Sequence, residues 1–181
     1  MIPTLLIVGD SFAADTDGWP SQLGVTVTNH SQRGVGEYKI LKQLKNHAEY
    51  ECVLIVHTSP WRVHTPHHPV HAKSNTRPHN DFMLADVEYH AQHNVEMTVV
   101  HEYLKKYYDP EYQQFVWNSA VDQMMQIDNA VHCTFHDPED TAKITHNYNH
   151  VWQQHPGDVN HLNTQGNALV AQLVEQLICN Q

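Results

Sequence analysis

Two short, continuously apolar segments constrain the fold of this chain more than any other feature. Thr4–Gly9 (TLLIVG) and Cys52–His57 (CVLIVH) lack the alternation of apolar and polar residues that marks a half-exposed strand. A strand with this pattern is buried on both faces, which is typical of parallel sheets covered by helices on both sides. We therefore predict a central parallel sheet.

Segments with a helical pattern alternate with the strands along the chain. Two weaker strands are predicted at Val25–Thr28 and Ala130–Phe135. A short helix is expected after Gly18, and longer ones are predicted at Glu37–His47, Asp81–Asn94, Glu96–Tyr107, Asp109 to about Ile127, and from Asn163 or Thr164 onward. Arg62–Asn80 is rich in proline and histidine and is predicted to be an irregular surface loop. The alternation indicates an α/β fold, and residues 1–181 are expected to form one domain.

The charge and composition exclude several classes of partner. A formal net charge of -10 disfavours nucleic acid and anionic membrane surfaces. No apolar run is long enough to span a membrane, and the first residues carry no basic region of a secretory signal. The 3 cysteines are widely spaced, as expected for reduced thiols, so we expect a cytoplasmic protein.

A serine follows the first strand, and a matching base lies near the other end of the chain. Ser11 comes directly after Gly9-Asp10, where the apolar run ends. Asp158 and His161 lie three residues apart, just before the last helix. A serine becomes a nucleophile when a base takes its proton, and that base needs a third group to orient it. The three residues therefore form a candidate catalytic triad.

These motifs resemble those of the SGNH, or GDSL-type, hydrolase family. Ser11 matches the serine of its first motif, and Asp158 and His161 match its last. Asn29 and Gly34 have the spacing of the family's oxyanion-hole glycine five residues after an asparagine. The resemblance implies a three-layer α/β/α, flavodoxin-like fold with a five-stranded parallel sheet. It also implies ester hydrolysis, with the backbone N–H groups of Ser11 and Gly34 binding the oxyanion.

One motif of the family is replaced. After the third strand the family carries Gly-x-Asn-Asp, whose asparagine donates to the oxyanion, whereas this chain has HTSPWR at residues 57–62. Thr58, Ser59 and Arg62 are candidate substitutes for that donor. Trp61 and Arg62 are also candidates for binding substrate, since tryptophan stacks on sugar rings and arginine pairs with carboxylates.

The expected substrate is a small-molecule or carbohydrate ester, for example an acetyl ester on a sugar. Two alternatives remain open: a binding module that keeps the fold without the chemistry, and an O-acyltransferase that uses the same triad. The oligomeric state is left open.

No cofactor and no metal site are expected. The loop histidines have helical spacing, but Pro66 and Pro69 interrupt any regular helix between them. These histidines are His64, His67, His68 and His71. Solvated side chains in a polar loop are therefore the favoured interpretation.

Overall fold

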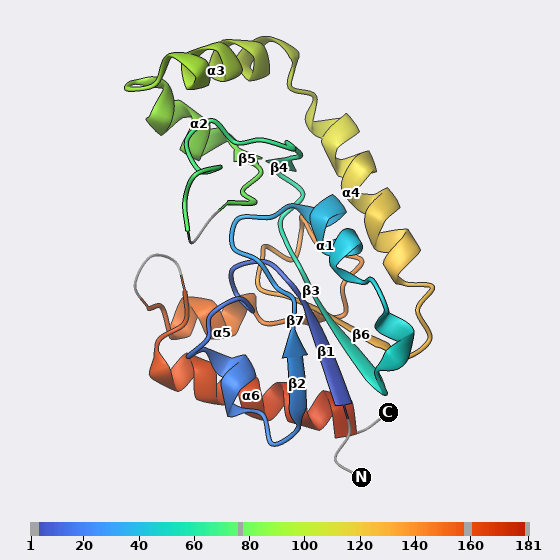
Figure 1. Cartoon of the computed structure of the whole chain (residues 1–181). Helices are drawn as coiled ribbons and strands as arrows, with labels where there is room; N and C mark the ends of the chain where they lie inside the picture. The colour runs from blue at the N-terminus through green and yellow to red at the C-terminus, as the bar shows by residue number, and fades with distance from the viewer. Residues whose placement is uncertain (1–3, 76–77, 158–160, 180–181) are drawn as a thin grey trace.

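The computed structural model describes residues 4–75, 78–157 and 161–179. Five strands form one sheet in the order β2-β1-β3-β6-β7, and every neighbouring pair is parallel (Figure 1). The strands are β1 (Thr4–Gly9), β2 (Thr26–Asn29), β3 (Cys52–His57), β6 (Ala130–Thr134) and β7 (His146–Asn147). The predicted α/β fold with a parallel sheet is confirmed. The short β7 lies in a polar segment for which the sequence predicts no element.

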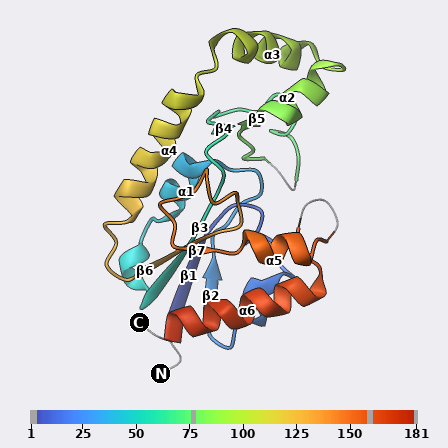
Figure 2. The same ribbon diagram turned by 180° about the vertical axis from the view of Figure 1, so that it is seen from behind.

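Helices cover both faces of the sheet, which explains why β1 and β3 are apolar throughout. On one face, Leu6 and Ile55 pack with α1 (Glu37–Gln43) and α4 (Pro110–Met124). Alternate strand residues pack on the opposite face, as the period of two requires. That face is covered by η1 (Trp19–Gln22), α5 (Asn149–Gln154) and α6 (Thr164–Cys179) (Figures 1 and 2).

The strand order places one edge of the sheet in position to bind a ligand. The chain passes from β1 to β2 on one side and then returns to β3 on the other side of β1. The connection that follows β1 and the connection that follows β3 therefore leave toward opposite sides of the sheet. The switch point in strand order lies between the carboxyl ends of these two strands. Ligands of open parallel sheets bind at this kind of switch point.

The long excursion between β3 and α4 is more ordered than the sequence predicts. It contains an antiparallel pair, β4 (Arg62–Val63) with β5 (Phe82–Met83), followed by α2 (Leu84–Ala91) and α3 (Val95–Tyr107). Val87, Met97 and Leu104 form a small core of their own, and α2 and α3 extend away from the sheet (Figure 1). The prediction of an irregular surface loop over Arg62–Asn80 is thus wrong in part.

Helix boundaries differ from the predictions where the chain turns early. α1 ends at Gln43, before the predicted His47, and Asn46 then adopts a left-handed conformation with φ 62° ahead of η2 (His47–Glu49). α2 begins at Leu84 because the two residues before it pair with β4. No helix in the described part of the chain is long and apolar enough to cross a membrane.

Candidate functional site

The turn after β1 carries Ser11 to the carboxyl edge of the sheet. A Cβ atom at Gly9 would lie 2.7 Å from the Cβ of Val56, so only glycine allows β1 and β3 to approach this closely. Asp10 is fully buried, and its Oδ1 accepts a hydrogen bond of 3.0 Å from the backbone N–H of Phe12. This bond closes the turn, and Ser11 lines the cavity above it.

The cavity has a volume of about 630 Å³. Its walls come from the segments after β1, β2, β3 and β6, from β5 and the segment before it, and from α2, α5 and His161. The lining residues are Ser11, Phe12, Arg33, Gly34, Ser59, Trp61, Arg62, Asn80, Asp81, Met83, Asp86, His136, Trp152 and His161. Ser11, Gly34 and His161, which are far apart in the sequence, therefore share one cavity.

His161 is oriented by a carboxylate that the sequence interpretation missed. Its Nδ1 lies 2.7 Å from Oδ2 of Asp15, and Oδ1 of Asp15 forms an ion pair with Arg33. The Phe12 ring packs beside the imidazole, with 6.0 Å between ring centroids. Asp158, predicted for the orienting role, lies outside the described residues. The only sequence signal for Asp15 is its position four residues after Ser11.

A second histidine and carboxylate lie beside the first pair. Nε2 of His136 is 3.2 Å from Oδ2 of Asp10, and the Thr58 hydroxyl donates to the same oxygen at 2.9 Å. Burial raises the pKa of Asp10, but His136, Arg62 and the Phe12 amide outweigh it and hold the pKa below its usual value. A buried negative charge therefore lies under the turn that presents Ser11.

Gly34 lies against a side-chain amide that the sequence interpretation also missed. Gly34 adopts φ 75°, and the Asn80 side chain occupies the space that a Cβ at residue 34 would need. Asn80 is buried and lines the cavity, and its Oδ1 has no hydrogen-bond partner among the described residues. An amide is thus present at the cavity wall, although the segment after β3 lacks one.

The candidate donors after β3 have different surroundings. The Thr58 hydroxyl donates to Asp10 and accepts from Nε of Arg62 at 3.2 Å, and Thr58 is not among the residues that line the cavity. Ser59, Trp61 and Arg62 do line it. Nη1 of Arg62 also donates to the Gly34 carbonyl at 3.3 Å, and Nε1 of Trp61 donates to Asp140 at 2.8 Å.

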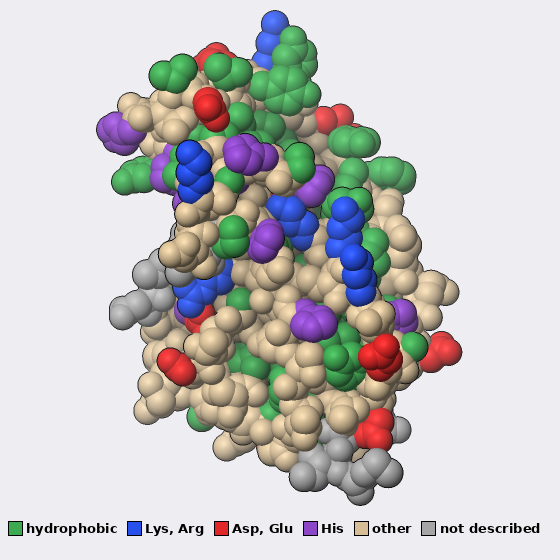
Figure 3. All heavy atoms as spheres, in the orientation of Figure 1, with side chains coloured by type: hydrophobic (Ala, Val, Ile, Leu, Met, Phe, Trp, Pro, Cys, Tyr) green, Lys and Arg blue, Asp and Glu red, His purple; other side chains and the backbone are tan. Residues whose placement is uncertain are grey.

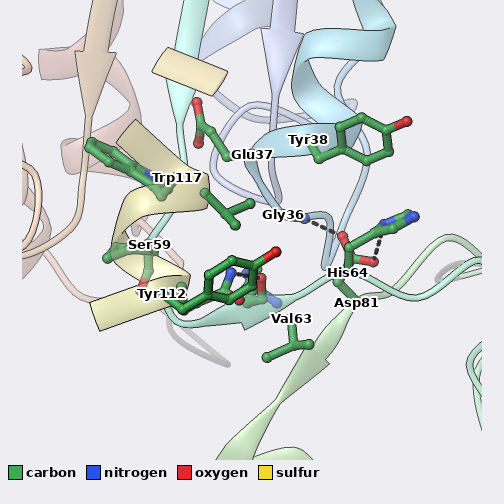
Figure 4. Close-up of a pocket in the computed structure, with 13 residues that line it drawn as sticks. Gly36, Glu37, Tyr38, Ser59, Val63, His64, Asp81, Tyr112 and Trp117 are labelled. Atoms are coloured by element: carbon green, nitrogen blue, oxygen red, sulfur yellow. Dashed lines mark hydrogen bonds and ion pairs between the residues drawn. The ribbon is translucent and has the colours of Figure 1, made fainter. Parts of the chain in front are cut away.

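A smaller cavity of about 200 Å³ shares part of its lining with the first, and Ser59, Asp81 and Trp117 are among the residues around it (Figure 4). Ser59, Arg62 and Asp81 line both cavities. Asp81 is buried, and its Oδ2 accepts from the Gly36 N–H at 2.7 Å while its Oδ1 pairs with Lys39 at 2.7 Å. Asp81 thereby fixes the loop that carries Gly34 against the wall between the cavities.

No protein-family model matches this sequence, and no curated protein matches it. The site itself is therefore the basis for assigning a function.

Proposed function

We propose that the protein is a serine ester hydrolase of the SGNH type, with Ser11 as nucleophile and His161 as base. The proposal rests on one observation: Ser11 and His161 line the same cavity, and Asp15 binds Nδ1 of His161 at 2.7 Å. With Nδ1 held by a carboxylate, Nε2 is the nitrogen that remains for the serine proton. This is the arrangement of roles that activates a serine.

The reaction proceeds through an acyl-enzyme. Oγ of Ser11 attacks the ester carbonyl carbon while Nε2 of His161 takes the hydroxyl proton. The bond to the alcohol oxygen then breaks, and His161 returns the proton to that oxygen. Water attacks the acyl-enzyme with His161 again taking a proton, which passes to Ser11 as the carboxylic acid leaves. Asp15 stabilises the imidazolium in both steps.

The oxyanion is bound by the backbone N–H groups of Ser11 and Gly34, with a side-chain donor nearby. Asn80 supplies the amide in this proposal, because it packs against Gly34 at the cavity wall. The Arg62 guanidinium, held by Thr58 and the Gly34 carbonyl, adds positive charge beside it. Donors of this kind contribute about 2.7–4 kcal/mol each to transition-state stabilisation.

The cavity supports a small acyl group on a carbohydrate as substrate. Phe12, Trp61 and Trp152 give it aromatic walls, on which the apolar face of a sugar ring can stack, and Arg33 and Arg62 add polar donors. A volume of about 630 Å³ lies within the range of pockets that bind small molecules and accommodates an acetylated monosaccharide.

Hydrolysis of p-nitrophenyl acetate by purified protein tests the proposal. We expect the wild type to turn over the ester and Ser11→Ala to lose the activity, while Ser119→Ala on α4 serves as the matched control. A fluorophosphonate should label wild type once per chain, at Ser11, as read by peptide mass spectrometry. Equal hydrolysis rates in the wild type and in folded Ser11→Ala, with no label at Ser11, would favour a binding module instead.

A further inference from the structure

A cluster of three histidines and one aspartate lies beside the larger cavity and has no part in the proposed reaction. His68 and His71 come from the loop between β4 and β5, whereas Asp86 and His90 are one turn apart on α2. In Figure 3, histidine side chains are visible at several separate points over the upper half of the molecule, the half that holds the β4–β5 loop and α2. Side chains from two separate segments thus converge on one point.

The donor atoms of His68, His71 and Asp86 have the spacing of ligands around a cation. Nε2 of His68 and Nε2 of His71 lie 3.5 and 3.4 Å from Oδ2 of Asp86, and Nε2 of His90 lies 3.4 Å from Oδ1. Ordinary hydrogen bonds of this type are about 2.7–3.2 Å long. Bonds of about 2.0–2.1 Å in a tetrahedral zinc site place two ligand atoms about 3.4 Å apart. The observed distances therefore fit coordination better than direct hydrogen bonding.

Burial strengthens this interpretation. Nε2 of His68 and Nε2 of His71 are both buried, and neither has a hydrogen-bond partner among the described residues. A buried polar atom without a partner is costly unless water or an ion satisfies it. The donor atoms of His68, His71 and Asp86 all lie within 4.8 Å of one another, so one ion can contact all three.

We propose that His68, His71 and Asp86 bind one divalent transition-metal ion. Two imidazoles and one carboxylate suit Zn²⁺, which takes nitrogen and oxygen ligands in tetrahedral geometry and can leave its fourth position open. His90 lies on the other oxygen of Asp86 and orients that carboxylate. The ion fastens the loop between β4 and β5 to α2. Because Asp86 also lines the larger cavity, the ion fixes one part of the cavity wall.

Binding of the metal ion through Nε2 of His68 removes two hydrogen bonds that the other ring nitrogen, Nδ1, accepts. Nδ1 faces the backbone N–H groups of Val70 and His71, each at 3.3 Å. Coordination at Nε2 places the ring proton on Nδ1, so these two long contacts are given up when the ion binds. This cost lowers the affinity but leaves the other two ligands unaffected.

Zinc binding is tested on the whole chain after treatment with a chelator and its removal by dialysis. Titration with ZnCl₂ in a calorimeter, with metal analysis of the dialysed complex, should give one ion per chain. His71→Ala and Asp86→Asn should each weaken binding by at least about 100-fold, since even the loss of a residue that only supports a ligand costs about 10–100-fold. His67→Ala and His93→Ala, exposed neighbours outside the cluster, are the matched controls and should bind as the wild type does.

Two outcomes would overturn the site. One is a folded wild type that takes up no Zn²⁺ at micromolar concentrations. The other is an equal loss of binding in the cluster variants and in the exposed controls, which would indicate scattered surface histidines. Co²⁺ gives a further readout, because a tetrahedral site produces intense visible absorption that Asp86→Asn should abolish. None of these measurements depends on ester hydrolysis. A failure of the metal-site proposal is therefore distinguishable from a failure of the proposed esterase function.

Discussion

At the scale of single residues, Asp15 holds Nδ1 of His161, so Nε2 is the nitrogen left for the proposed reaction with Ser11. Its Oδ2 lies 2.7 Å from Nδ1, and its other oxygen is held by Arg33. The ion pair with Arg33 holds the Asp15 carboxylate in place, and this carboxylate holds the His161 imidazole. Nε2 of His161 therefore remains for the proposed serine nucleophile. In this arrangement Arg33 is a positioning residue that acts through Asp15.

Asp15→Asn should lower kcat for ester hydrolysis by about 10²–10⁴-fold, because the imidazolium loses its carboxylate partner and its preferred tautomer. Asp17→Asn, an exposed aspartate two residues further on, is the control and should retain wild-type kcat. Asp158→Asn is measured in parallel. If Asp158→Asn loses the activity and Asp15→Asn keeps it, the orienting carboxylate is Asp158 and our assignment is wrong.

At the scale of the elements, α4 supports the end of β3. Nε1 of Trp117 on this helix donates to the Thr58 carbonyl at 2.9 Å, directly after β3. Gln113 of the same helix donates to the Arg62 carbonyl at 2.9 Å. The position of α4 therefore bears on Thr58 and Arg62, which stand beside the proposed oxyanion site.

The N-terminus of α4 is capped by Asp109, and the contribution of this cap to stability can be measured. Oδ1 of Asp109 accepts from the N–H groups of Glu111 and Tyr112 at 3.0 and 3.1 Å, and Pro110 occupies the first turn. Asp109→Ala should lower the free energy of unfolding by about 0.5–2 kcal/mol, measured by urea denaturation, whereas Asp109→Ser should restore most of it. An Asp109→Ala variant as stable as the wild type would show that the cap contributes nothing.

At the scale of the whole molecule, stability depends on pH through those histidines whose pKa changes on folding. His132 on β6 is the clearest case, since burial, together with His57 and His146, lowers its pKa to about 4. Its Nδ1 lies 2.8 Å from Nε2 of His57, which is fully buried. Between about pH 4 and 6.5 the unfolded chain therefore binds a proton at this residue that the folded chain does not.

The sign of this effect is a loss of stability as pH falls from about 6.5 to about 4. His132→Asn removes the titrating group, so its free energy of unfolding should fall less between about pH 7 and pH 4.5 than that of the wild type. Urea denaturation at both pH values measures the difference, and His93→Asn on the surface should keep the wild-type dependence. Parallel pH profiles for the wild type and His132→Asn would contradict the assignment.

The sequence by itself determined four of the five strands of the sheet, all but β7, and most of the helices. A strand that is buried on both faces is a continuous run of apolar residues. Such a run is visible in a few consecutive residues, and it identified β1 and β3. The Asp109-Pro110 start of α4 was equally local, because a cap acts on the next few amides. The apolar run also ends at Gly9, so the position of Ser11 at the edge of the sheet was predictable from the sequence. The role of Ser11 stays a prediction.

Tertiary structure alone decided what surrounds these residues. Asp15 and His161 are 146 positions apart in the chain, and Asn80 reaches Gly34 from a segment that looked like a loop. The proposed metal ligands show the same limit: the prolines argued against a helical histidine site, but folding supplied Asp86 from a different segment. Contacts of this kind depend on how distant segments pack, and no local period in the sequence encodes them.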